Sequence, residues 1–216
     1  THFTPKYNPW DQRLCLVPDA DMFDAIKSGR AEVVTDTIDT FTEKGIKLKS
    51  GKELQADIIV TATGLQLEVL GGTEVVVDGR RVDFGKTFTY KGLMYSDVPN
   101  LASVFGYTNA SWTLRADLIC EWVTRLLNTM DEKGVQIATP HPKTPLTEEP
   151  WLDFSSGYVV RALSMLPKQG NRAPWRQNQN YFADIKAMRK APVEDEELVF
   201  AKAKAGAKPV LARAAE

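Results

Sequence analysis

The first of three stretches with side chains suited to chemistry lies near the start of the chain, at Asn8-Pro9-Trp10-Asp11-Gln12-Arg13. Arg13 stays charged at any working pH and offers a rigid fork of donors. Beside Trp10 and Asp11 it could hold an oxyanion or a phosphate. A structural pair of Arg13 with Asp11, or stacking of its guanidinium on an aromatic ring, explains the same residues without a ligand.

The second stretch, Asp57-Ile58-Ile59-Val60-Thr61-Ala62-Thr63-Gly64, predicts a buried strand that ends in small residues. Gly64 has no Cβ, so a backbone or a ligand can approach it closely. Ligands in open α/β sheets bind at the carboxyl ends of such strands. A tight strand exit without a ligand remains the alternative.

The third stretch, Gly106-Tyr107-Thr108-Asn109-Ala110-Ser111-Trp112, leads into the strongest helix of the chain. Free N–H groups and the positive end of the dipole point out of a helix N-terminus, which can hold an anion or a negatively charged carbonyl oxygen. Simple N-capping by Asn109 or Ser111 is an alternative, and it is compatible with ligand binding.

Several other classes of site lack the residues they need. The sequence has no G-x-G-x-x-G, no P-loop, and only two histidines, His2 and His141, for a metal or a hydrolytic triad. Cys15 and Cys120 are far apart, which favours a reduced, cytoplasmic chain. The net charge of −1 favours neither nucleic acid nor an anionic membrane, and no apolar run approaches the ~20 residues of a membrane span.

Hydrophobic periodicity predicts an α/β fold with a small β-meander, parallel-type strands and one long helix. Strands are expected over 31–35, 37–42, 46–49, 53–61 and 101–105, with a hairpin over 73–84 that turns at Asp78-Gly79. The long helix begins at Ser111 and ends near Gly134, and shorter helices are expected over 21–28, 157–166 and 180–190.

The character of the sequence changes near residue 139, where prolines begin to cluster. We therefore expect one domain portion over residues 1–138 and a helical C-terminal extension over 139–192. The acidic and then Ala/Lys-rich segment 193–216 is expected to be a mobile tail.

Four stretches together resemble one family, the ethionamide-activating FAD-containing monooxygenases, which are class B flavin monooxygenases of the Baeyer–Villiger type. The resemblance reaches to about residue 202, and its motifs occur in order. They are Phe3-Thr4-Pro5-Lys6-Tyr7-Asn8-Pro9-Trp10-Asp11-Gln12-Arg13-Leu14-Cys15, Ala56 to Leu65, Gly106 to Leu114, and Leu166-Pro167-Lys168-Gln169-Gly170 with Pro174-Trp175-Arg176-Gln177-Asn178-Gln179-Asn180-Tyr181.

The resemblance implies roles for particular residues. Arg13 matches the catalytic arginine against the flavin, where it would stabilise a C4a-peroxyflavin anion. Thr63 and Gly64 match a strand end that contacts FAD, and the run Asn109, Ala110 and Ser111 matches the helix start beneath the flavin ring. A reduced flavin carries negative charge along N1–C2=O, which suits that helix start.

The resemblance further implies the cofactors FAD and NADPH. It also implies a substrate that is either a ketone, into which one oxygen atom of dioxygen is inserted, or a thioether or thioamide, whose sulfur is oxidised. The FAD and NADPH fingerprints and the family's His/Trp signature are absent here, and in the family they precede the match to Thr1. Gln12 also stands where many Baeyer–Villiger enzymes place a lysine. We therefore expect the C-terminal part of a two-dinucleotide-binding-domain flavoprotein that is inactive alone and associates with the missing N-terminal half or with itself.

Two other classes of function stay open. A truncated product could be a non-catalytic binding or assembly module derived from such an enzyme. An N-hydroxylating flavin monooxygenase is the nearer enzymatic alternative, whereas a disulfide reductase lacks support because the chain has no CxxC pair.

Overall fold

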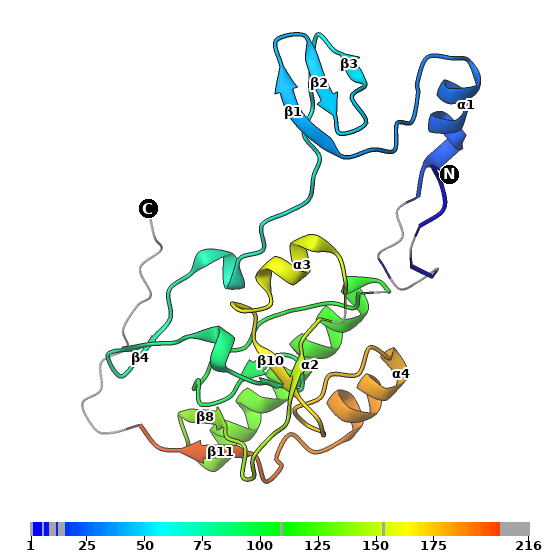
Figure 1. Cartoon of the computed structure of the whole chain (residues 1–216). Helices are drawn as coiled ribbons and strands as arrows, with labels where there is room; N and C mark the ends of the chain where they lie inside the picture. Colours follow the sequence, from blue (N-terminus) through cyan, green and yellow to red (C-terminus); the bar gives the residue numbers. More distant parts are fainter. Residues whose placement is uncertain are drawn as a thin grey trace. The chain divides into compact units, whose positions relative to one another are not determined.

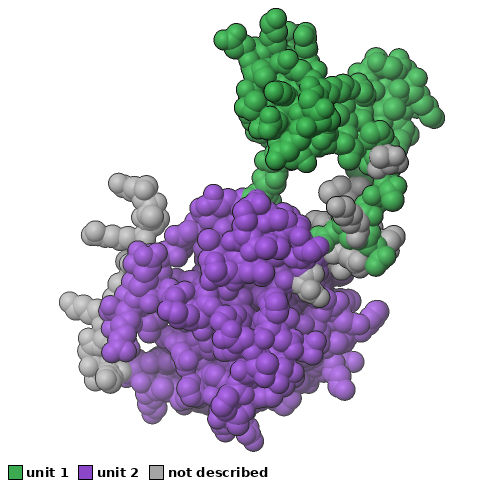
Figure 2. Space-filling view, in the orientation of Figure 1, with its two compact units in different colours: residues 1–65 green, residues 66–216 purple. Residues whose placement is uncertain are grey.

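The chain divides into two compact units, residues 1–65 and 66–216 (Figure 1, Figure 2). This computed structural model describes residues 2–5, 7, 8, 12, 16–108, 110–152 and 154–203. The division falls at another place than the predicted boundary near residue 138, which concerns domains of the whole protein and stays a prediction.

Unit 1 combines a short helix with a three-stranded antiparallel sheet. The 3-10 turn η1 (Pro18–Ala20) leads into α1 (Asp21–Lys27), and the positive φ of 74° at Gly29 follows the helix end as its glycine predicts. The strands β1 (Ile38–Thr42), β2 (Gly45–Leu48) and β3 (Glu53–Gln55) are neighbours in that order. The meander predicted from alternating residues is therefore confirmed.

The buried strand predicted to run on to Thr61 is wrong. The last strand of the sheet, β3, ends at Gln55, and residues 56–68 are extended without regular structure. Ile58 and Val60 are 81% and 84% exposed. An apolar run forms a strand only where its backbone N–H and C=O groups hydrogen-bond to a neighbouring strand. No strand in the described part of the chain pairs with residues 57–61.

Unit 2 carries two-stranded antiparallel ribbons around one long helix. The ribbons join β4 (Val76–Val77) to β5 (Arg80–Arg81), β6 (Thr89–Tyr90) to β7 (Met94–Tyr95), β8 (Ile137–Pro140) to β11 (Leu198–Ala201), and β9 (Glu148–Pro150) to β10 (Lys168–Gly170). The helices are α2 (Trp112–Lys133), α3 (Gly157–Ala162) and α4 (Tyr181–Asp184), which continues into the π-helical turn η4 (Ile185–Lys190); 3-10 turns lie at η2 (Val69–Gly72) and η3 (Phe84–Lys86).

The result is a mixed α/β chain with small antiparallel sheets. The predicted hairpin is confirmed, with positive φ at both Asp78 and Gly79. The predicted parallel-type strands do not form in the described residues, where every paired strand is antiparallel and a parallel contact occurs as the single bridge Phe88–Lys168. The strand expected over 101–105 is reduced to one bridge at Ala102, and none forms over 31–35.

The core of unit 2 is built on the apolar face of α2. Leu118, Ile119, Trp122 and Leu126 are at most 5% exposed, and they belong to one cluster with residues of β6–β7, β8, η4 and β11. The set includes Tyr90, Met94, Ala138, Trp175, Met188, Val193 and Leu198. Spacings of three and four residues place the helix positions on one side, as predicted.

Two further predictions differ from the structure. Leu114 and Leu127, expected on the buried face of α2, are 39% and 55% exposed, so that face is narrower than predicted. In the segment 193–216 that we expected to be mobile, Leu198–Ala201 forms β11 and pairs with β8, and Leu198 is buried.

The packing of α2 predicts a contrast between two leucines of the same helix. Leu118→Ala should lower the free energy of unfolding by about 2–5 kcal/mol, because the side chain is 1% exposed and leaves a cavity. Leu127→Ala removes the same atoms from a 55% exposed site and should change the free energy of unfolding by about 0.5 kcal/mol or less. Urea unfolding measures both; equal losses would contradict the placement of the core.

Candidate functional site

The loop before α2 is folded tightly onto the first residue of the helix. A Cβ at Gly106 would lie 2.3 Å from Cγ of the Trp112 ring, so only glycine allows this approach. Phe105 also packs against this ring, with its ring centroid 5.0 Å from that of Trp112 and 4.4 Å from that of Trp151. The glycine and the aromatic residues of the third stretch therefore have a local packing role.

Ser111, one of the two N-caps that the sequence allowed, does not cap α2 with its side chain. Ser111 occupies the N-cap position with extended backbone angles, but its side chain makes no capping hydrogen bond. Ala110 and Ser111 are both exposed. The first N–H groups of the helix are thus free of a Ser111 cap and could bind an anion or a carbonyl oxygen.

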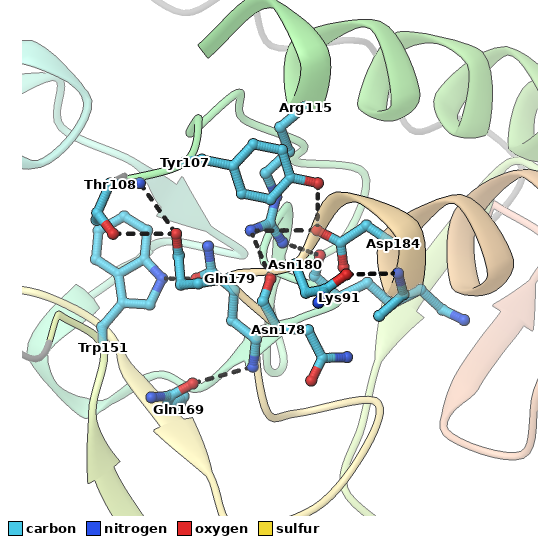
Figure 3. Close-up of polar contacts among 12 residues, drawn as sticks. Lys91, Tyr107, Thr108, Arg115, Trp151, Gln169, Asn178, Gln179, Asn180 and Asp184 are labelled. Atoms are coloured by element: carbon cyan, nitrogen blue, oxygen red, sulfur yellow. Dashed lines mark hydrogen bonds and ion pairs between the residues drawn. The ribbon is translucent and has the colours of Figure 1, made fainter. Parts of the chain in front are cut away.

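Three buried polar side chains lie behind this loop, contributed by the loop, by α2 and by α4. The hydroxyl of Tyr107 donates to Oδ2 of Asp184 at 2.7 Å, and Nη1 of Arg115 lies 3.7 Å from the same oxygen (Figure 3). Tyr107, Arg115 and Asp184 are at most 3% exposed. The guanidinium also lies 5.4 Å from the centre of the Tyr107 ring, so the three side chains form one buried polar cluster.

A second set of contacts joins the same loop to residues 169–179. The backbone N–H and the hydroxyl of Thr108 both donate to Oε1 of Gln179, at 3.0 and 3.1 Å. Nε1 of Trp151 donates to Oε1 of Gln177 at 2.7 Å, and the Gln177 backbone N–H donates to Gln169 (Figure 3). Because loops hold fixed positions only when their polar groups are paired, these bonds position residues 106–108.

The helical segment 181–190 is fixed in turn against α2. Asn180 accepts a hydrogen bond from the N–H of Ala183 and so caps α4. Arg125 of α2 donates to the backbone carbonyls of Met188, Arg189 and Ala191, at 2.6, 3.0 and 2.8 Å. Carbonyls near the end of a helix need such donors, so Arg125 anchors the segment that carries Asp184.

Burial opposes charge on every member of the buried cluster. It raises the pKa of the Asp184 carboxyl, although Arg115 and the Tyr107 hydroxyl pull that pKa downward. Burial also lowers the pKa of the Arg115 guanidinium and raises the pKa of the Tyr107 hydroxyl, to which the bond to Asp184 adds. The largest cause of all three pKa shifts is the removal of the charged form from water.

The site residues predicted from the sequence lie in three places. Arg13 and Asn109 fall outside the described residues. Thr63 and Gly64 lie in the exposed extended segment of unit 1, where Gly64 has a φ of 115° that only glycine adopts readily. Ala110 and Ser111 are adjacent at the start of α2 in unit 2. Whether these groups form one site stays a prediction.

The buried cluster itself was not predicted. Its signal in the sequence was a charge on the apolar stripe of α2, because Arg115 stands three residues before Leu118 and four before Ile119. Asp184 carried the same signal, lying four residues before the buried Met188. A charged residue on a buried face needs a partner, and pairing the two would have located the cluster.

No metal-binding cluster and no membrane-spanning helix occurs among the described residues. No group of three His, Cys, Asp or Glu side chains in them is placed to hold a metal ion. Within the same part of the chain no helix is long and apolar enough to cross a membrane. His141 contacts Asp97 at 2.6 Å on the surface, and Cys120 is an exposed free thiol.

Comparison with known proteins confirms the resemblance that the motifs carried. The chain is 56% identical over 202 residues to the FAD-containing monooxygenase EthA of Mycobacterium tuberculosis. The matched region covers 93% of this chain and 41% of that protein. It is 55% identical over 205 residues to EthA of Mycolicibacterium smegmatis, covering 94% and 42%.

The similarity extends to relatives with other names. The chain is 51% identical over 203 residues to the probable FAD-binding monooxygenase AlmA of Acinetobacter baylyi, covering 93% of this chain and 41% of that protein. It thus spans about two-fifths of the length of these relatives. No family model matches the chain.

The buried cluster predicts strong coupling between Arg115 and Asp184. Asp184→Ala should lower the free energy of unfolding by about 3–5 kcal/mol, because it leaves the guanidinium buried without a carboxylate. The double variant Arg115→Met/Asp184→Ala should lose much less than the sum of Arg115→Met and Asp184→Ala. As a control, Glu194→Gln breaks the exposed pair with Lys133 and should have little effect. Additive losses in urea unfolding would contradict the coupling.

The raised pKa of Asp184 predicts a pH dependence of stability. The folded chain binds this proton more tightly than the unfolded chain does, so the carboxyl's contribution is fully present below its ordinary pKa of 3.8 and is lost as the pH rises through the raised value. As the pH rises through that window, the free energy of unfolding of the native chain should fall relative to that of Asp184→Asn. A difference that is constant with pH, or that changes in the opposite direction, would contradict the raised pKa.

Proposed function

We propose that the chain is the C-terminal portion of an FAD- and NADPH-dependent monooxygenase of the Baeyer–Villiger type. The whole enzyme inserts one oxygen atom from dioxygen into ketones, or oxidises sulfur in thioethers and thioamides. One observation carries the proposal: 56% identity over 93% of the chain to proteins named FAD-containing monooxygenases. NADPH and the substrate class rest on the motif resemblance.

The cofactor supplies the redox chemistry when it is bound, and the protein supplies position and charge. In this proposal Arg13 is the catalytic residue, a permanent cation that stabilises negative charge developing at the reacting atoms. Thr63 and Gly64 contact FAD from the segment after β3, where Gly64 presents no Cβ. Asn109, Ala110 and Ser111 contact it from the start of α2.

The start of α2 fits a flavin on an observation independent of the relatives. Its first N–H groups receive no side-chain cap from Ser111, and the small, exposed Ala110 leaves room above them. An isoalloxazine ring presents carbonyl oxygens and a nitrogen that accept such hydrogen bonds and carry negative charge when reduced. The helix start can therefore hold that edge of the ring without a charged side chain.

The buried cluster then acts on the cofactor site through the loop. Tyr107 bonds Asp184 and Thr108 bonds Gln179, so the segment 177–184 holds the residues that directly precede Asn109 and Ala110. In this assignment residues 1–138 are part of the FAD-binding domain, and the extension 139–192 positions its loop.

The missing portion of the enzyme is the partner we propose for this chain. Ile58, Val60 and Leu65 are 81%, 84% and 65% exposed in unit 1. Exposed apolar side chains along one segment mark a surface that binds a partner. The rest of the protein would cover these side chains.

Purified alone, incubated with FAD and then dialysed against FAD-free buffer, the chain should show no visible flavin absorbance and should not oxidise NADPH. A chimera that supplies the remaining length of EthA of Mycobacterium tuberculosis ahead of Thr1 should bind FAD, oxidise NADPH and oxygenate a ketone or a thioether. In the chimera, Arg13→Ala should retain flavin but lose about 10²–10³-fold in oxygenation rate, the effect of removing one charge-stabilising group.

Arg30→Ala is the matched control, since Arg30 is an exposed arginine of unit 1 that contacts Ser28. It should leave the rate unchanged. NADPH oxidation by the isolated chain would contradict its inactivity. A chimera that binds FAD yet oxygenates neither substrate class would contradict the proposed reaction.

A further inference from the structure

Four consecutive carboxylates, Glu194 to Glu197, lie in the segment that the sequence predicted to be mobile, yet each of them pairs with a basic side chain. In chain order the partners are Lys133 at 2.7 Å, Lys91 at 3.2 Å, Lys143 at 3.4 Å and Arg172 at 2.7 Å. These cations come from the end of α2, the β6–β7 turn, the loop after β8 and the loop after β10. The acidic run therefore connects four separate segments of unit 2.

Asp195 holds the β6–β7 turn. Its Oδ2 accepts a hydrogen bond from the hydroxyl of the fully buried Tyr90 at 2.5 Å and lies 3.2 Å from Nζ of Lys91. The Lys91 ammonium also lies 5.3 Å from the centre of the Tyr90 ring. One carboxylate thus fixes two adjacent side chains of the turn.

Glu197 holds the loop after β10 in the same way. Its side chain is 10% exposed, with Oε1 2.7 Å from Nη1 of Arg172 and Oε2 accepting from the indole Nε1 of Trp175. An indole N–H can only donate, and a buried one needs an acceptor. Glu197 is therefore the group that allows the Trp175 ring to lie in the core.

The two segments held by Asp195 and Glu197 also contact each other. The Lys91 N–H donates to the Pro174 carbonyl at 2.7 Å, and the rings of Tyr90 and Trp175 pack edge to face with centroids 5.5 Å apart. The Lys91 carbonyl in turn accepts from Nη2 of Arg115 at 3.3 Å. The acidic run thus supports a turn that contacts the buried cluster.

The strand that follows the acidic run has little else to hold it. In the described part of the chain β11 pairs with β8 alone (Figure 1), and a two-stranded ribbon is marginally stable by itself. The His141 N–H donates to the Glu197 carbonyl at 2.7 Å, which continues this ribbon. The Ala138 N–H of β8 donates instead to Oδ1 of Asn100 at 2.9 Å, so β8 keeps a partner when β11 leaves.

We propose that residues 193–201 form a latch that opens as one unit while α2 and its core stay folded. The carboxylates of Asp195 and Glu197 hold the latch closed, and its opening releases the β6–β7 turn next to the buried cluster. Segments held by few contacts open at a lower free energy than the core around them. The proposal does not depend on the proposed monooxygenase activity.

The latch would act on the loop before α2 through contacts already described. The turn supplies the Lys91 carbonyl to Arg115, and Arg115 lies beside Asp184, which accepts from Tyr107. A closed latch therefore supports the cluster that holds this loop. An open latch removes one acceptor of the Arg115 guanidinium.

Native-state hydrogen exchange of the full 216-residue chain, followed by NMR in increasing urea, measures the opening. The His141 amide reports the latch, the Lys91 amide reports the turn, and the Leu126 amide in α2 reports global unfolding. His141 and Lys91 should exchange roughly 10-fold or more faster than Leu126 after correction for intrinsic rates. Both should depend on urea less steeply than Leu126, because the latch exposes less surface than global unfolding does.

Glu197→Gln and Glu196→Gln are matched variants of adjacent residues. Glu197→Gln keeps an oxygen for the Trp175 indole but loses the charge beside Arg172, so exchange at His141 should accelerate roughly 10–100-fold. Glu196 is 86% exposed in its pair with Lys143, and Glu196→Gln should accelerate the same amide by about 5-fold or less. Protection of Leu126 in the same samples shows that each variant is folded.

Three results would overturn the proposal. Exchange at His141 that depends on urea as steeply as exchange at Leu126 would show that β11 opens only with the whole unit. A Lys91 amide that exchanges with Leu126 and not with His141 would show that the turn is not released. Equal acceleration in Glu197→Gln and Glu196→Gln would show that the buried carboxylate does not hold the segment.

Discussion

Burial of a guanidinium beside α2 is the constraint on which the arrangement of unit 2 depends. Arg115 is 1% exposed and lies on the same helix face as Leu118 and Trp122, so the core cannot close without a countercharge. That countercharge is Asp184, nearly seventy residues later in the chain. The ion pair therefore obliges the last helical segment to pack against α2, and Arg125 fixes its end there.

The same constraint connects the C-terminal extension to the proposed cofactor site. Asp184 accepts from Tyr107, and Gln179 accepts from Thr108, so the extension fixes the two residues that lead to the start of α2. Gly106 completes the loop because the Trp112 ring occupies the place of a Cβ. The helix start receives no side-chain cap from Ser111, and free N–H groups there are the property that a flavin edge or another anionic group requires.

Two buried donors next to the cluster, on Arg115 and Gln177, have no partner among the described residues. Tyr107 holds the Asp184 carboxylate, and Trp151 holds the Gln177 amide, so neither is free to turn toward Arg115. Unpaired buried donors are costly unless something binds them. Arg115 meets this cost only in part, since Nη1 and Nη2 reach backbone carbonyls at 3.5 and 3.3 Å while Nε has no partner among the described residues.

Local patterns were sufficient for elements whose stability is local. The turn at Asp78-Gly79, the end of α1 at Gly29 and the span of α2 all followed from backbone preference and periodicity, and the order of the motifs identified the relatives. The strand expected over 57–61 failed because a strand needs a neighbour that no pattern within it can supply. The Tyr107–Arg115–Asp184 cluster also escaped sequence reasoning, since only tertiary packing decides which distant charge shares a buried face with another.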